Sequence, residues 1–175
     1  VFWGCSSLSL INVDSENKNF TSKDNVLYSK DESELICYPC RKKEKSFIIP
    51  HGVTSIANVA FQGCNSLTSI EIPDSVILIG KDAFSGCVSL TALEIPDSVK
   101  SIGLFAFQSC HSLTSVKIPS SVTSIGNGAF SDCPSNLTIY GEEGSYAQLY
   151  AKQNNIKFEI IKEPDTEPTP DTQPT

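Results

Sequence analysis

The 175-residue sequence contains no methionine, two histidines and one tryptophan, and no apolar run long enough for a membrane-spanning helix. So little histidine leaves few candidates for general-base catalysis or metal ligation. The chain begins with Val1, so we expect it to be a fragment or a processed product of a longer protein, with repeats missing before its N-terminus. We also expect no membrane insertion of this fragment.

Basic residues are scarce too, with 13 Lys+Arg against 20 Asp+Glu and a net charge of −7. Such a chain is a poor partner for a phosphate backbone, so we expect no binding to nucleic acid. Four of the acids, and no base, lie in the proline- and threonine-rich residues 163–175. This composition predicts a disordered linker, or a fraying tail without a role. The remainder has a net charge of −3, so the acidity says little about a partner.

What the sequence has in abundance is a period of 23 residues. Six columns recur in four successive units, and they begin at Pro50, Val53, Ile56, Ala60, Phe61 and Cys64. The units span 50–72, 73–95, 96–118 and 119–141, and the last degenerates near its end. A short unit of this kind cannot bury its own apolar face, so the period predicts a solenoid of stacked coils.

The segments around this array divide the rest of the chain. Residues 1–13 read as the end of a truncated repeat, because their apolar positions match the later columns, and residues 14–49 form an irregular 36-residue coil or insert. Residues 142–162 predict a C-terminal cap, made of a helix with Ser145 as its N-cap and a strand from Ile156 to Ile161. This cap should shield the edge of the last coil.

Each unit contains local structure signals. Ser69 and Glu71 alternate with Ile70 and Ile72, which predicts a half-buried strand that ends at the following proline. Val53 and Ile56 form a second short apolar pair, in the part of the unit where the chain runs back around the coil. Ala-Phe-x-x-Cys predicts a brief helical or 3₁₀ turn. Equal spacing predicts parallel strands in register, with the phenylalanines and the cysteines stacked as ladders inside.

The repeat unit Leu-x-x-Ile-x-Ile-Pro-x-x-Val-x-x-Ile-Gly-x-x-Ala-Phe-x-x-Cys resembles the BspA-like (Treponema-type) leucine-rich repeats over about residues 1–161. The resemblance implies an α/β-type solenoid, a right-handed coil with a parallel β-sheet, short helical or 3₁₀ turns and a C-terminal cap. It also implies a secreted or cell-surface, non-enzymatic protein without cofactors that mediates adhesion to a protein or glycan on a host or neighbouring cell. The insert departs from the family in its Cys-Tyr-Pro-Cys sequence and in Asn25, where glycine is common.

Seven cysteines suggest a disulfide scaffold or a metal site. Five of them, Cys5 included, occupy one repeat column, where a thiol packs as a small apolar group and a linear ladder offers no metal cage. Cys37 and Cys40 lie off the repeat. They can form a disulfide, remain thiols near solvent, pack incidentally, or serve redox or metal chemistry.

Two surfaces are candidates for ligand binding. The first is the outward sheet face, whose small and polar side chains predict weak binding strengthened by avidity: Ser69, Glu71, Ala92, Glu94, Ser115 and Lys117. The second is the insert, unless its aromatics fill the wider coil and its charges form a solvated loop: Phe20, Tyr28, Tyr38, Arg41, Lys42 and Lys43.

No catalytic or metal constellation can be assembled from the sequence. We therefore expect a non-enzymatic binding domain. The alternatives are a structural stalk that presents another domain and, third, a thiol redox module through Cys37 and Cys40.

Overall fold

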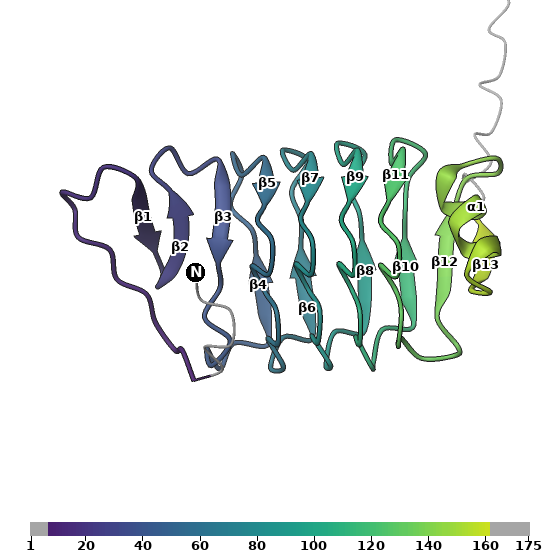
Figure 1. The fold of residues 1–175 in the computed structure, drawn as a ribbon, viewed down its shortest axis with the longest axis horizontal. Helices are drawn as coiled ribbons and strands as arrows, with labels where there is room; N and C mark the ends of the chain where they lie inside the picture. The colour runs from purple at the N-terminus through teal and green to yellow at the C-terminus, as the bar shows by residue number, and fades with distance from the viewer. Residues whose placement is uncertain (1–6, 162–175) are drawn as a thin grey trace, which may run out of the picture.

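The computed structural model describes residues 7–161, which form an elongated stack of coils with strands along each of two sides (Figure 1). The first sheet has the strand order β1-β2-β3-β5-β7-β9-β11. Its strands are β1 (Phe20–Lys23), β2 (Val26–Ser29), β3 (Glu34–Cys37), β5 (Ser55–Ile56), β7 (Leu78–Ile79), β9 (Ser101–Ile102) and β11 (Ser124–Ile125).

The second side carries β4 paired with β6, followed by a four-stranded sheet of order β13-β12-β10-β8. Its strands are β4 (Ser46–Ile48), β6 (Ser69–Glu71), β8 (Ala92–Glu94), β10 (Ser115–Lys117), β12 (Thr138–Gly141) and β13 (Lys157–Ile160). The strands on this side pair in parallel, and Leu93 lies opposite Val116 at the expected spacing. The predicted parallel, in-register solenoid is confirmed.

Two details of the repeat differ from the prediction. The segment from Val53 to Ile56 contains a strand of its own, β5, so that each regular coil contributes a strand to each of the two sides. The Ala-Phe-x-x-Cys segment is not helical. Cys64 N donates to Phe61 O at 3.1 Å, but Val59 and Gly63 have φ angles of 59° and 73°. Left-handed residues on this short spacing stop a right-handed helix from propagating, so the segment remains a series of turns.

The insert begins with an antiparallel hairpin of β1 and β2, and β2 pairs in turn with β3. Asp24 and Asn25 form its turn, with φ angles of 50° and 65°. A two-residue hairpin turn of this kind needs positive φ at both positions, which asparagine and aspartate tolerate. This explains how Asn25 replaces the glycine common in the family. Strand β3 then runs parallel to β5, so the parallel array starts inside residues 14–49.

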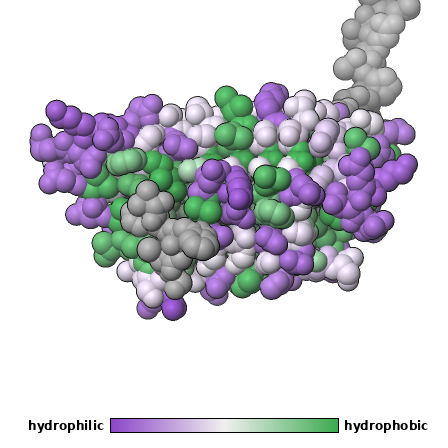
Figure 2. Space-filling view, viewed as in Figure 1, coloured by the Kyte–Doolittle hydropathy of each residue, from purple (hydrophilic) through white to green (hydrophobic). Residues whose placement is uncertain are grey.

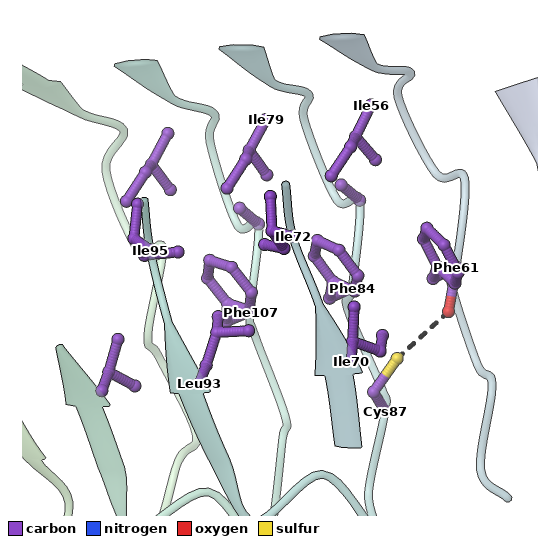
Figure 3. Packing of buried hydrophobic residues seen from close by; sticks show 14 of the residues in the cluster. Ile56, Phe61, Ile70, Ile72, Ile79, Phe84, Cys87, Leu93, Ile95 and Phe107 are labelled. Carbon is purple, nitrogen blue, oxygen red and sulfur yellow. Dashed lines mark hydrogen bonds between the residues drawn. The ribbon is translucent and has the colours of Figure 1, made fainter. Parts of the chain in front are cut away.

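The core is a continuous column of stacked rings, and Figure 3 shows Phe61, Phe84 and Phe107 of this column. Phe61, Phe84, Phe107 and Phe130 have successive ring-centroid distances of 4.9, 5.1 and 5.2 Å, with ring planes within 13° of parallel. The predicted phenylalanine ladder is confirmed. Tyr38 stacks on its N-terminal end at 5.2 Å, and Tyr150 closes the other end edge-on at 6.0 Å.

The C-terminal end is covered by helix α1 (Tyr146–Gln153) and by β13. Ser145 is the N-cap of the helix, and its side chain accepts a hydrogen bond from Gln148 N. The predicted helix and strand are confirmed, although β13 extends the sheet and becomes its terminal strand rather than a cover over its edge. No helix within residues 7–161 has the length and apolar character to cross a membrane. The linker predicted for residues 163–175 lies outside the described residues.

Candidate functional site

The six predicted positions of the sheet face lie on three neighbouring coils. Ser69 and Glu71 are exposed on β6, Ala92 and Glu94 on β8, and Lys117 on β10, while Ser115 on β10 is half-buried. Lys117 lies opposite Glu94 in register, and its Nζ is 2.6 Å from a carboxylate oxygen of Glu94. The structure therefore brings these residues together on one open surface, where partner contacts would repeat along the stack.

The same row continues beyond the predicted residues at both ends. Ile48 on β4 lies opposite Glu71 and is 63% exposed, and Tyr140 on β12 lies opposite Lys117. Each is one period away from a predicted position, so the 23-residue spacing could have identified both. They add to the row the large side chains that the predicted set lacked. We call Ile48, Glu71, Glu94, Lys117 and Tyr140 the outer row.

The outer row is interrupted between β6 and β8, where the two parts of this side meet. A surface cleft of about 340 Å³ opens there, lined by Ile70, Glu71, Ile72, Asp74, Glu94 and Pro96. Figure 2 shows hydrophilic side chains at the end of the molecule that carries β1 and β2, a hydrophobic area beside them, and smaller hydrophobic areas among polar ones over the middle coils. The visible face thus offers a mixed surface rather than one large apolar patch.

The insert residues divide into exposed and buried groups. Phe20, Arg41 and Lys43 are exposed, whereas Tyr28 and Tyr38 keep only 3% and 1% of their surface accessible. The expectation that both tyrosines lie on the insert surface is therefore corrected, since they fill the wider coil. Tyr38 lies one period before Phe61, and its place in the ladder is the physical reason.

Lys42 also supports the fold more than it presents a charge to solvent. Its Nζ donates to the backbone oxygen of Asp24 at 2.6 Å and lies 3.6 Å from a carboxylate oxygen of Glu44. The same atom is 5.5 Å from the ring centroid of Tyr38. With 9% of its side chain exposed, Lys42 ties the hairpin turn to the loop after β3.

Within residues 7–161 the cysteine column packs inside the coils as predicted, and each of its thiols also makes a hydrogen bond, whereas Cys5 lies outside the described residues. The Sγ of Cys87 donates to Phe61 O at 3.1 Å, as the dashed line in Figure 3 shows. Cys110 and Cys133 repeat the contact to the phenylalanine carbonyl of the preceding coil, at 3.2 and 3.3 Å. Because burial disfavours the thiolate, the pKa of Cys110 is raised to about 12 and the pKa of Cys133 to about 11.

These shifts predict loss of stability in alkali. An unfolded thiol ionises near 9.0, whereas the folded thiol holds its proton until the pH reaches its raised pKa. The stabilisation is therefore complete below about pH 9 and is lost as the pH rises toward 12. At pH 10.5 we expect Cys110 alone to lower the free energy of unfolding by about 2 kcal/mol.

Urea unfolding followed by circular dichroism at pH 8 and 10.5 measures the change. A Cys110→Ala variant should lose less between the two pH values, and an equal loss would contradict the prediction.

Cys40 lies at the N-terminal end of this column. Its Sγ is 3.3 Å from the Sγ of Cys64 and donates to Gln62 O at 2.9 Å. The Sγ of Cys37 donates to Tyr38 O at 3.8 Å. A disulfide between Cys37 and Cys40 stays one of the alternatives that the sequence leaves open. Within the part of the chain that the structure describes, no three His, Cys, Asp or Glu side chains are placed to hold a metal ion.

A coil that places one short strand on each of two sides, each paired in parallel within the repeat array, with an apolar ladder between them, defines a leucine-rich-repeat type of solenoid. The family described as "BspA type Leucine rich repeat region" matches residues 33–158 in six copies. The chain belongs to this family. The matched range includes part of the predicted insert and most of the C-terminal cap.

Solved structures of bacterial proteins share the fold. A leucine-rich cell surface protein from Faecalibacterium prausnitzii A2-165 is 34% identical, with a TM-score of 0.55 over 84% of this chain and 45% of that one. The T. pallidum leucine-rich repeat protein TpLRR is 28% identical, with a TM-score of 0.52 over 73% and 71% of the two chains. The pneumococcal vaccine antigen PcpA is 21% identical, with a TM-score of 0.67 over 89% and 51%, and shows the fold alone. This chain thus spans about half the length of PcpA and of the F. prausnitzii protein. No curated protein sequence matches the chain.

Proposed function

We propose that this chain is a non-enzymatic binding domain of a secreted or cell-surface protein and that its outer row engages a protein on a host or neighbouring cell. The observation that carries the proposal is the open row itself. Its members recur at one position per coil and lie in register. Such a row can contact a partner at several regularly spaced points.

The chemistry of the row determines the kind of binding. Ile48 and Tyr140 supply apolar contact at its ends, while Glu71, Glu94 and Lys117 supply charge between them. Interfaces with so few large anchors are weak individually, because most binding energy comes from a few buried aromatic, arginine or large apolar side chains. We therefore expect measurable adhesion only when several copies act together. The 34% identical cell surface protein from F. prausnitzii supports a surface location.

The test uses the chain biotinylated at one end and presented as a streptavidin tetramer to intact epithelial cells. Flow cytometry should show saturable binding that the monomer does not achieve at equal chain concentration. The double variant Ile48→Ala with Lys117→Ala should reduce this binding by about tenfold or more, because it removes the exposed apolar contact and the only basic side chain of the row.

The opposite sheet supplies a matched control. Ile77 and Lys100 are both exposed there, next to β7 and β9, so Ile77→Ala with Lys100→Ala makes the same chemical changes away from the outer row. Equal loss in both double variants would contradict the assignment of the surface. Protease treatment of the cells should abolish binding, whereas loss only after glycosidase treatment would identify a glycan partner. Absence of tetramer binding to any cell type would favour a structural stalk.

A further inference from the structure

The two sulfurs at the start of the cysteine column form an exception within the column. In the regular coils a cysteine Sγ meets the phenylalanine carbonyl of the preceding coil at 3.1 to 3.3 Å. At Cys64 the corresponding distance, to Tyr38 O, is 3.9 Å. Cys64 instead directs its thiol at Cys40, with the sulfurs 3.3 Å apart.

The local sequence explains the contact. Tyr38 occupies the phenylalanine column, but the cysteine that follows it stands two residues later, whereas in the repeats it stands three residues later. Cys40 is therefore offset by one residue from the repeat position, because it lies 24 positions from Cys64 instead of 23. This offset brings sulfur against sulfur rather than sulfur against a carbonyl.

We propose that Cys40 and Cys64 form a reversible disulfide that fastens the irregular N-terminal coil to the first regular repeat. The residues lie on adjacent coils, where neighbouring strands are separated by about 4.8 Å, a spacing that a disulfide can bridge. The sulfurs need to approach by only about 1.3 Å to reach bonding distance. This inference is independent of the proposed binding function.

The reaction is a thiol–disulfide exchange with a low-molecular-weight disulfide, such as oxidised glutathione, as the oxidant. The Cys40 thiolate attacks one sulfur of the oxidant, forms a mixed disulfide and releases one thiolate. The Cys64 sulfur then attacks Cys40 Sγ and releases the second thiolate. The two protons from the cysteines go to the two leaving thiolates, so two protein thiols are oxidised and one external disulfide is reduced to two thiols.

The environments of the two sulfurs suit these roles. Cys40 is half-exposed and can meet an oxidant from solvent, whereas Cys64 is 1% exposed and can meet only Cys40. The hydrogen bond from the Cys64 thiol holds the pKa of Cys40 below its ordinary value, and the same bond together with burial raises the pKa of Cys64. Cys40 is thus the attacking thiol. Cys64 is the resolving thiol because of its position against Cys40, and it gives up its proton only as its sulfur attacks.

Tryptic peptides test the pairing directly. The chain is equilibrated in mixtures of reduced and oxidised glutathione, alkylated with N-ethylmaleimide under denaturing conditions, digested and analysed by mass spectrometry without reduction. Cys37 and Cys40 share the peptide 31–41, while Cys64 lies alone in 46–81. We expect a covalent 31–41/46–81 pair under oxidising conditions, with the loss of two alkylatable thiols per chain.

Single-residue variants identify which two cysteines form the disulfide. Cys40→Ser and Cys64→Ala should each abolish the cross-linked pair, and Cys40 is exposed enough for its variant to fold. Cys37→Ser, on the same peptide, and Cys87→Ala, the next buried position of the column, should both retain it. An internal disulfide within 31–41 would overturn the proposal in favour of Cys37–Cys40. Full alkylation of every cysteine under all redox conditions would overturn it as well.

Discussion

Replacing Phe107 with alanine should lower the free energy of unfolding by about 3–5 kcal/mol. Phe107 is fully buried, and its ring stacks between those of Phe84 and Phe130 at 5.1 and 5.2 Å. The truncation removes a large apolar side chain and leaves a cavity that coils held by two sheets cannot close. Neighbouring coils of a solenoid stabilise one another mainly through their contacts, so a gap at Phe107 weakens the coupling between the two halves.

Urea unfolding monitored by circular dichroism measures this effect. We expect a lower midpoint together with a broader or two-step transition, because the N-terminal and C-terminal coils then unfold less cooperatively. Phe20→Ala is the matched control, since Phe20 lies on β1 and is 41% exposed. Its cost should stay below about 1 kcal/mol. A Phe107→Ala cost as small as that of Phe20→Ala would refute the stabilising role of the ladder.

Replacing Gly103 with alanine should cost about 3 kcal/mol, through a clash rather than a cavity. An added Cβ would lie 2.5 Å from the carbonyl carbon of Gly80 and 2.6 Å from Lys81 N. These are backbone atoms of the preceding coil, so no rotamer change can relieve the contact. Gly126 has the same close approach to the coil of Gly103, and the repeated glycine therefore sets how tightly the coils stack.

Gly63→Ala separates this effect from the conformational freedom of glycine. A Cβ at Gly63 meets nothing within 4 Å, but the residue has a φ of 73°, so strain alone should cost about 1 kcal/mol. Urea unfolding of both variants compares crowding with backbone strain. Equal destabilisation would mean that space between the coils is not what selects glycine at position 103.

Much of the solenoid was predictable because its information is local and repeated. The 23-residue spacing sets which residues stack, and the alternation around Ile70 sets which of them face inward. The phenylalanine ladder, the parallel register and the Ser145 cap follow from these patterns. The short strands of the first sheet did not, because two residues are too few for an alternation to appear. The expected helical turns failed because φ at Val59 depends on its contacts with the next coil, where Val59 N donates to Lys81 O.

The candidate binding surfaces were likewise predictable from the sequence in part only. The exposed positions of β6, β8 and β10 follow from the strand alternation. Ile48 and Tyr140 were reachable by the period, but Ile48 precedes the first unit and Tyr140 lies in the degenerate end of the last one. Tyr28 could not be placed from the sequence, since the hairpin that carries it folds back against the array through antiparallel pairing. Its burial depends on contacts between segments whose separation follows no period.

The sequence by itself therefore determined the family, the coil and the inward columns, because each coil repeats the interactions of the one before it. Only the tertiary structure decided where that repetition breaks. The approach of Cys40 to Cys64 and the burial of Tyr38 beneath Lys42 both arise where the irregular coil meets the first regular repeat. At those points the fit between two particular surfaces, rather than the period, sets which atoms meet.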